Sequence, residues 1–219
     1  AKLNIPNEYP PLAITCLKNS ISETEFLLEK KANPNQVFHE VSIELSTILF
    51  QNRNALYSPI DIACQKSKPD LLLTLLKHNG DVSGKEMNKG SPLVTACHDG
   101  NREIIDILIE KGANPSVFNY KKVSPLFAAI EKNNLELIEY LLSDKFDVDV
   151  NAYGYENNLT PLGAACNGGG PDMVELLLKN NANPNIRTNN NQINCIEEAF
   201  KGFSKEHNIK TVETLIKYG

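Results

Sequence analysis

The sequence predicts an all-α fold, a solenoid of stacked helix–turn–helix units joined by hairpin-like loops. A proline followed by Leu or Ile recurs as Pro11, Pro59, Pro92, Pro125 and Pro161, with two equal separations of 33 residues. A three-residue turn signal with Asn or Asp at its centre begins 21 residues after each of these prolines. Self-similarity at this period is typical of repeat proteins, in which each unit buries its apolar face against its neighbours.

Each unit opens with the residue types that start a helix. Ser58, Ser91, Ser124 and Thr160 stand directly before a repeat proline. A hydroxyl at this place accepts a hydrogen bond from a free backbone N–H, and proline is favoured at the first helical position. The helix is then expected to end at residues that tolerate a left-handed turn, and these are Asn19, Gly100, Asn133 and Gly169.

A second helix is predicted in each unit from its apolar spacing. In the third unit Ile104, Ile105, Leu108 and Ile109 fall three or four residues apart, which places them on one helix face. The turn signals that follow, such as Asn114-Pro115, favour an extended turn that leads to the next helix pair.

These residues resemble the ankyrin repeat, and the third unit is the closest match. It contains Ser91-Pro92-Leu93, Ala96-Cys97, Gly100-Asn101 and Gly112-Ala113-Asn114-Pro115. One feature of the family differs, because no unit has its histidine after Pro-Leu. The residues at that position are Ala13, Asp61, Val94, Phe127, Gly163 and Glu197, so some hydrogen bonding at the helix start must be made differently.

The resemblance implies one ankyrin-repeat domain over residues 1–219. Cys195 takes the proline's place in a degenerate sixth unit, which reaches Gly219 about four residues late, so a longer inner loop is expected there. All other extra residues are expected between units and none inside the first five. The predicted units cover approximately residues 8–35, 56–83, 89–116, 122–150, 158–185 and 192–219, with an insertion at about 36–55.

Composition and charge exclude several functional classes. The net charge is -5, which argues against nucleic-acid binding because that relies on Lys and Arg contacts to phosphate. No segment approaches the roughly 20 apolar residues that a membrane helix needs. Of the five cysteines, Cys16, Cys64, Cys97 and Cys166 all lie five residues after a repeat proline, which predicts small buried core residues. Free thiols favour an intracellular, cytoplasmic location.

No pattern of catalytic, metal-binding or cofactor-binding residues is found, so an enzyme is not expected. His39, His78, His98 and His207 occupy unrelated positions in the units and form no ligand pair at metal-site spacing. Gly168-Gly169-Gly170 lacks the following Gly-Lys-Ser/Thr of a phosphate loop, and we interpret it as the turn between two helices.

The resemblance implies that a partner protein binds the concave face, which is made of the turn tips and the exposed side of the first helices. Tyr120, Tyr153 and Tyr155 are the strongest candidates, since aromatic residues at tips often anchor interfaces. Phe118 is either a further anchor or a residue packed between turns. The candidate partner-binding residues are Met87, Lys89, Tyr120, Lys121, Tyr153, Tyr155, His98, Asp99, Glu131, Lys132, Gln65 and Lys66.

The insertion between the first two units has two interpretations. Val37, Val41, Leu45 and Ile48-Leu49 fit an amphipathic helix, whereas Val41, Ile43 and Leu45 fit a short strand. Such a segment either packs over the first units as a cap or contacts a partner.

The function that the sequence favours is that of a protein–protein interaction module, monomeric by itself. The alternative is the targeting or substrate-recognition region of a larger enzyme or secreted effector, delivered into a host cell, whose catalytic domain lies outside this fragment. The missing initial Met, and the end at Gly219 just before an expected Ala-Asn, favour that alternative. A spacer without any ligand is a third, minor hypothesis.

Overall fold

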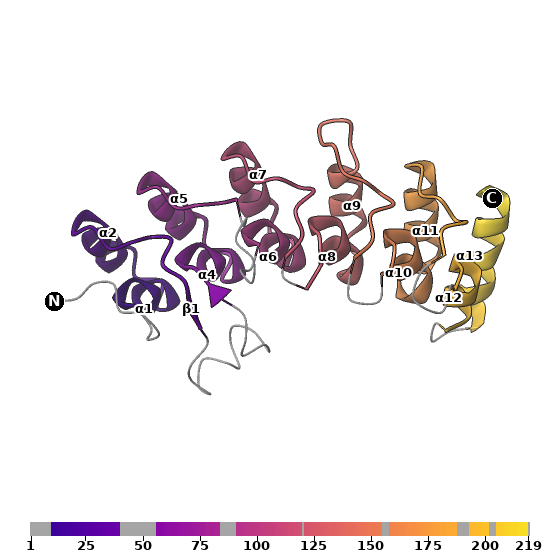
Figure 1. Cartoon of the computed structure of the whole chain (residues 1–219), viewed down its shortest axis with the longest axis horizontal. Coiled ribbons are helices and arrows are strands. Elements are labelled where there is room, and N and C mark those ends of the chain that lie inside the picture. The colour runs from indigo at the N-terminus through magenta and orange to yellow at the C-terminus, as the bar shows by residue number, and fades with distance from the viewer. Residues whose placement is uncertain are drawn as a thin grey trace. The chain divides into compact units, whose positions relative to one another are not determined.

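Figure 1 shows the computed structural model, which describes residues 10–39, 56–83, 91–119, 121–154, 158–187, 193–201 and 205–218. The chain forms two compact halves, residues 1–120 (unit 1) and 121–219 (unit 2). From here on, each helix–turn–helix element is called a repeat. The described residues of each half form three helix pairs, and we call the first helix of a pair inner and the second outer. Unit 1 consists of α1 (Pro11–Leu17) with α2 (Ile21–Glu29), α4 (Pro59–Gln65) with α5 (Pro69–Lys77), and α6 (Pro92–Asp99) with α7 (Arg102–Glu110).

Unit 2 has the same plan. Its pairs are α8 (Pro125–Glu131) with α9 (Leu135–Leu141), α10 (Pro161–Gly168) with α11 (Gly170–Lys179), and α12 (Cys195–Lys201) with α13 (Lys205–Tyr218). Inner helices pack on inner helices and outer on outer, so that α10 contacts both α8 and α12, and α11 contacts both α9 and α13. The same holds in unit 1, where α4 lies against α1 and α6. The predicted fold of stacked helix–turn–helix units is confirmed.

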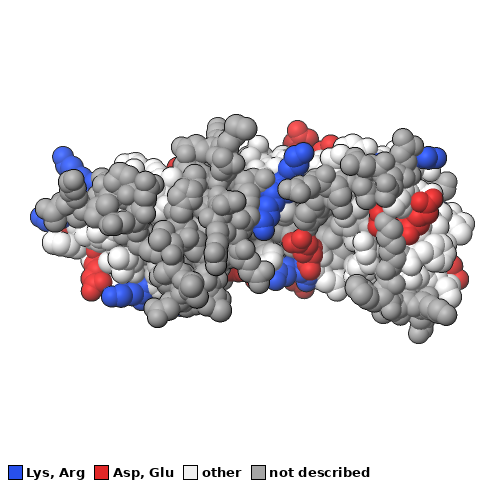
Figure 2. All heavy atoms as spheres, turned by 60° about the horizontal axis from the view of Figure 1, so that its bottom comes forward, with Lys and Arg blue, Asp and Glu red and all other residues white. Residues whose placement is uncertain are grey.

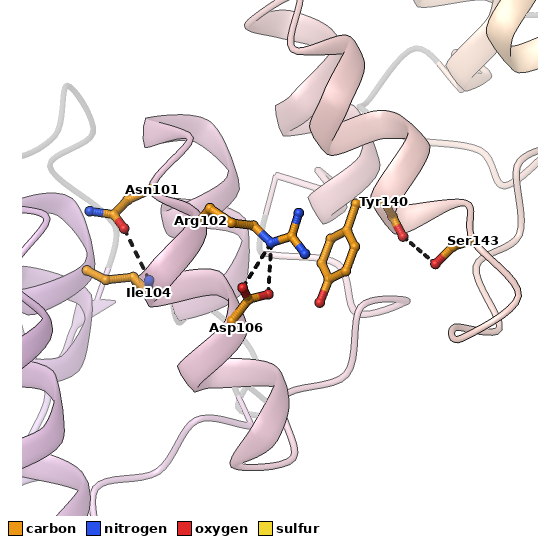
Figure 3. Close-up of polar contacts among 6 residues, drawn as sticks. All are labelled: Asn101, Arg102, Ile104, Asp106, Tyr140 and Ser143. Atoms are coloured by element: carbon orange, nitrogen blue, oxygen red, sulfur yellow. Dashed lines mark hydrogen bonds and ion pairs between the residues drawn. The ribbon is translucent and has the colours of Figure 1, made fainter.

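The predicted helix starts are confirmed at the hydrogen-bond level. The hydroxyls of Ser58, Ser91, Ser124 and Thr160 each accept from the backbone N–H three residues on. Two outer helices are capped by asparagine, and Figure 3 shows one of them, in which Asn101 Oδ1 accepts from Ile104 N at 3.1 Å. These bonds satisfy N–H groups that have no partner within the helix.

The turn between inner and outer helix passes through a left-handed residue, as expected. Asn19, Gly100 and Asn133 have φ of 54°, 75° and 52°. In the fifth repeat the prediction was one residue early, because Gly169 has φ of -90° and Gly170 is the left-handed residue, with φ of 78°. A β-carbon at Gly169 would instead meet Met173 Sδ at 2.5 Å, so packing explains that glycine.

Cys16, Cys64, Cys97 and Cys166 are core residues, as predicted, and Cys195 is buried as well. All five are free and buried, with Cys16, Cys64 and Cys97 wholly inaccessible to solvent. Burial raises the pKa of Cys16 to about 12 and also raises the pKa of Cys64 and Cys97. A hydrogen bond with Cys195, followed by burial, raises the pKa of Cys166. These four thiols therefore stay uncharged and act as small packing groups.

The turns after the outer helices share one Asx geometry. The Oδ1 atoms of Asn33, Asp81, Asn114 and Asn183 each accept from the backbone N–H two residues later, at 2.8–2.9 Å. In the fourth repeat this acceptor is Asp149, which bonds Asn151 N at 2.8 Å.

The expected turn centre in the fourth repeat, Asp147, is therefore wrong by two residues. Two of the three extra residues therefore lie inside this repeat, between α9 and the turn, and one lies between the turn and the next repeat. Ser143 Oγ donates to Tyr140 O at 2.7 Å, as Figure 3 shows, and Phe146 packs edge-on against Tyr140 with 5.1 Å between ring centres. The fourth repeat thus absorbs most of its extra length in a loop folded onto its own outer helix.

Two asparagines connect neighbouring repeats through their side-chain amides. Asn35 Nδ2 donates to Asn79 O at 2.9 Å, while Asn35 Oδ1 accepts from Asp81 N at 2.7 Å. Asn151 repeats the arrangement in unit 2, donating to Asn181 O at 3.2 Å and accepting from Asn183 N at 2.8 Å. Each amide pairs backbone groups of the next repeat that no helix satisfies.

The insertion begins and ends in a short antiparallel ladder. β1 (Phe38–His39) pairs with β2 (Leu56–Tyr57), and Phe38 lies opposite Tyr57. Both aromatic residues are buried, so the base of the insertion packs on the repeats. Residues 40–55, for which we predicted either a helix or a strand, lie outside the described residues.

The sixth repeat differs from its prediction. α13 begins ten residues after Cys195, the offset that α7 and α9 have from their prolines, and it continues for 14 residues. The extra residues therefore extend the outer helix and do not lengthen the inner loop. Thr211 and Leu215, four residues apart, are its buried contacts.

Candidate functional site

The ends of the inner helices form the part of the candidate surface that the structure describes best. We call the sixth and seventh residues after each repeat proline the inner-helix ends. In unit 1 these include Gln65 and Lys66, which are half-buried, and His98 and Asp99, which are exposed. The first five residues after the proline are mostly buried in the same helices, because they face neighbouring helices. In α4 and α6 the most accessible polar groups therefore lie where the helix ends.

Neighbouring inner-helix ends in unit 1 lie close together. α4 packs on α6, and the charge of Asp99 contributes, after burial and the charge of Asp61, to the raised pKa of Cys64 in α4. His98 Nδ1 lies 3.8 Å from Asp99 Oδ1, and both side chains remain partly accessible. The stacking thus brings two predicted positions, Gln65-Lys66 and His98-Asp99, onto one face of unit 1.

Unit 2 carries the corresponding positions on α8 and α10. Glu131 and Lys132 are both exposed. Asn167 is half-buried, and its Nδ2 donates to Glu198 Oε2 of α12 at 3.4 Å. Glu198 is only 2% exposed, so the Asn167 amide has a packing role in addition to any contact with a partner.

The hairpin tips are partly described. Tyr153 is 52% exposed and Lys121 is exposed, as the prediction requires. Tyr153 directly precedes Gly154, whose backbone pairs with Leu159 at 2.8 and 2.9 Å. Phe118 is 37% exposed, so it is neither fully packed nor fully free.

Four of the predicted residues cannot be placed. Met87, Lys89, Tyr120 and Tyr155 lie outside the described residues and remain predictions. The candidates that lie on the described part are therefore the inner-helix ends of each unit, with Lys121 and Tyr153 in unit 2.

The charges on the described surface are mixed in sign. In Figure 2 the lower side of Figure 1 comes forward, and Lys or Arg side chains lie among Asp and Glu side chains. Phosphate recognition requires a concentration of positive charge. The interspersed charges and the net charge of -5 suit hydrogen bonding and ion pairing with a protein surface.

Within the described ranges, no group of three or more His, Cys, Asp or Glu residues could hold a metal ion. The Gly168–Gly170 segment joins α10 to α11, as predicted for a turn. Nor does any helix of the described chain have the length and apolar character needed to cross a membrane.

One exposed feature was missed in the sequence. Ile196, Phe200, Ile209 and Ile216 are accessible on the last helix pair. The signal was present in the 3–4–7 spacing of Ile209, Val212 and Ile216, but we predicted no role for these residues.

The fold is similar to that of known repeat proteins. Residues 60–153 match a family model described as ankyrin repeats in three copies, and residues 157–189 match one described as an ankyrin repeat. The crystal structure of the human ASB11 ankyrin repeat domain superposes with a TM-score of 0.72 at 21% identity, covering 100% of this chain and 88% of that one. Among curated proteins, none matches the chain.

Proposed function

The chain belongs to the ankyrin repeat family, and from that premise we propose that it binds a partner protein through the inner-helix ends and hairpin tips. This is the concave face that the family resemblance implies. Ankyrin repeats are generally protein–protein interaction modules, and their specificity comes from exposed side chains and not from the fold. The identity of the partner therefore depends on the exposed residues that differ from repeat to repeat at equivalent positions.

The observation that carries the proposal is the chemical variety at one structural position. The inner-helix ends read Gln65-Lys66, His98-Asp99 and Glu131-Lys132 in three successive repeats, whereas the preceding positions are buried and mostly apolar or small. Stacking alone requires only that these ends be polar. A sequence of amide, imidazole, carboxylate and ammonium groups offers a partner a specific order of donors and acceptors.

The exposed tyrosine supports the same surface. Tyr153 lies beside the Gly154–Leu159 bridge, which limits the freedom of its backbone. A half-exposed aromatic side chain on an ordered backbone loses little entropy on binding and can bury a large area. We expect it to act as an anchor at the edge of the contact.

The buried free thiols support an intracellular, cytoplasmic setting as part of this proposal. Cys64 and Cys97 sit in the core of adjacent repeats, where they remain protonated. Reducing compartments preserve such thiols.

The experiment exchanges charges on an inner helix and compares the result with a matched exchange on an outer helix. Glu131→Lys with Lys132→Glu alters the last residue and the cap of α8. Glu110→Lys with Lys111→Glu makes the same exchange at the last residue and the cap of α7. Both pairs keep the net charge and carry the same helix-end effect, so they differ only in the face that they alter.

Wild-type and variant chains are used as bait, and captured proteins are quantified by mass spectrometry. The proposal predicts that a protein captured by the wild type is lost with the α8 exchange and retained with the α7 exchange. Tyr153→Asp should also reduce its capture. Equal capture by both exchanged chains, with unchanged thermal melts, would place the interface elsewhere.

A further inference from the structure

The junction between the fifth and sixth repeats brings two thiols into contact. Cys166 lies in α10 and Cys195 is the first residue of α12, and these two inner helices pack on one another. The two side chains form a hydrogen bond. Both are buried, with exposed fractions of 5% and 0%. Two sulfur atoms at this separation need only a small side-chain movement to reach the geometry of a disulfide.

A second contact holds the same two helices together beside the thiols. Asn167 directly follows Cys166, and its Nδ2 donates to Glu198 Oε2 at 3.4 Å. Glu198 follows Cys195 by three residues, so both lie on one side of α12, and Glu198 is 2% exposed. The contact between the thiols is therefore part of a buried cluster and does not depend on two mobile surface side chains.

The second thiol of the pair stands where other repeats have a proline. Cys64 holds the position of Cys166 in the second repeat, and the third repeat begins with Pro92. In the sixth repeat Cys195 replaces this proline. Proline is favoured at the first helical position, so the replacement gives up a preference of the helix start and adds a sulfur atom beside Cys166.

The two thiols are not equivalent. The hydrogen bond from Cys166 lowers the pKa of Cys195, although burial and the charge of Glu198 oppose this change. The same hydrogen bond, followed by burial, raises the pKa of Cys166. Because the thiolate is the reactive form, Cys195 is the nucleophile of the pair and Cys166 is the second thiol placed next to it.

We propose that Cys166 and Cys195 form a reversible disulfide that locks the sixth repeat onto the fifth, with hydrogen peroxide as the oxidant. The Cys195 thiolate first attacks one peroxide oxygen, the O–O bond breaks, and the departing hydroxide takes up a proton to leave as water. Cys166 Sγ then attacks the resulting sulfenic sulfur, the S–O bond breaks, and hydroxide leaves with the Cys166 proton as water. Two thiols thus lose two electrons in all, and one peroxide is reduced to two molecules of water.

The burial of the pair restricts the oxidant. Neither sulfur is open to a bulky reagent, so oxidation requires a small molecule that enters during local opening of the repeat. Hydrogen peroxide meets this requirement, whereas a large disulfide such as oxidised glutathione should react much more slowly. Once formed, the bond closes the loop of chain that contains α11, which restricts the unfolded state and stabilises the folded one.

The test treats the reduced 219-residue chain with hydrogen peroxide, unfolds it, blocks the remaining thiols and maps its peptides by mass spectrometry without reduction. The proposal expects a crosslink between Cys166 and Cys195, with Cys16, Cys64 and Cys97 recovered as blocked thiols. In thermal melts followed by circular dichroism, the oxidised chain should melt at least about 3 °C higher than the reduced chain. A thiol reductant should reverse the shift.

Two single changes separate the roles of the thiols. Cys166→Ser keeps a hydrogen-bond donor but removes the second sulfur, so Cys195 should stop at the sulfenic acid, which a 1,3-diketone reagent traps. Cys195→Ser should leave Cys166 reduced. The matched control is Cys64→Ser with Cys97→Ser, which alters two buried thiols of adjacent inner helices and should leave the crosslink unchanged. If a single variant fails to fold, the peptide map of the wild type decides.

Three results would overturn the proposal. Peroxide could leave both thiols free, or carry Cys195 to the sulfinic acid, without a crosslink to Cys166. Crosslinks from this pair to Cys16, Cys64 or Cys97 could be as frequent as the crosslink within the pair, which would mean that the contact does not direct the reaction. A fully crosslinked chain that melts at the temperature of the reduced chain would contradict the lock.

Discussion

The second and fourth repeats fill the same position, two residues after the repeat proline, in opposite ways. Asp61 stands there in α4 and Phe127 in α8, and both are buried, with exposed fractions of 2% and 0%. One is a carboxylate and the other an aromatic ring. The comparison separates what the fold requires at this position from what each repeat adds.

Asp61 stabilises its own helix start. Its Oδ2 accepts from Ser58 N at 2.8 Å and from Ser58 Oγ at 2.7 Å, while Asp61 N donates to Ser58 Oγ. This reciprocal arrangement is a capping box, which satisfies two N–H groups within four residues. The second repeat thus uses local hydrogen bonds at the position where family members have a histidine.

Phe127 stabilises a distant contact. A β-carbon built on Gly154 would meet the Phe127 ring at 2.4 Å, so the ring packs directly on the backbone of the hairpin that leads to α10. The start of this helix is capped by the Ser124 hydroxyl, which accepts from Phe127 N at 3.3 Å. The fold therefore requires burial at this position, and the chemistry of the buried group decides whether it stabilises a helix or a hairpin.

The largest effect is expected from Phe127→Ala. The change leaves a cavity beneath Gly154 and should lower the free energy of unfolding by about 3–5 kcal/mol. Urea denaturation followed by circular dichroism measures it. A loss below about 1 kcal/mol would show that the site collapses around the smaller side chain and that the ring contributes little.

Gly154→Ala should have the next largest effect. It should lower the free energy of unfolding by about 2–3 kcal/mol, because the added methyl group overlaps the Phe127 ring. Combining it with Phe127→Leu provides space, so the double variant should lose less than the sum of the single changes. A double-mutant cycle in the same urea assay checks this. Strict additivity would mean that the glycine is needed for another reason.

Asp61→Ala should cost about 1.5 kcal/mol, since Ser58 loses an acceptor for its buried N–H. The control is Asp70→Ala, an exposed acid in the first turn of α5 that makes only a helix-dipole contribution. Thermal melts of both variants should show a clear drop for Asp61 and a small one for Asp70. Equal drops would mean that charge near a helix start, and not the capping box, is the cause.

Asn151→Ala should have the smallest effect, about 1 kcal/mol, through the loss of its two bonds to the fifth repeat. Asn185 stands at the same place in the fifth repeat, and the described residues give its side chain no hydrogen bond, so Asn185→Ala serves as the control. Hydrogen exchange at Asn183 N should quicken only in the first variant. Unchanged exchange would contradict the role of the bridge.

The repeat, its helix starts and the buried cysteines could be predicted from the sequence because they depend on local residue types. For example, Ser91 directly precedes Pro92, and Cys97 follows Pro92 by five residues. Both can be interpreted from the residues of a single repeat. Neighbouring units confirm it by repetition.

Other features depend on contacts that spacing does not encode. Asp147 and Asp149 are both suitable turn residues, and the turn forms at the second, after a loop in which Phe146 packs on Tyr140. The exposure of Phe200 could not be predicted from the sequence either, because the same position is buried in the preceding repeats. Burial there depends on whether a neighbour covers the residue.

The proposed interface is tested most directly by hydrogen exchange of the chain with and without a captured partner. The account predicts slower exchange at the C-terminal ends of the inner helices, such as 96–100 of α6 and 128–132 of α8, and no change at 107–111 of α7. Slower exchange confined to the outer helices, with the inner-helix ends unaffected, would contradict it.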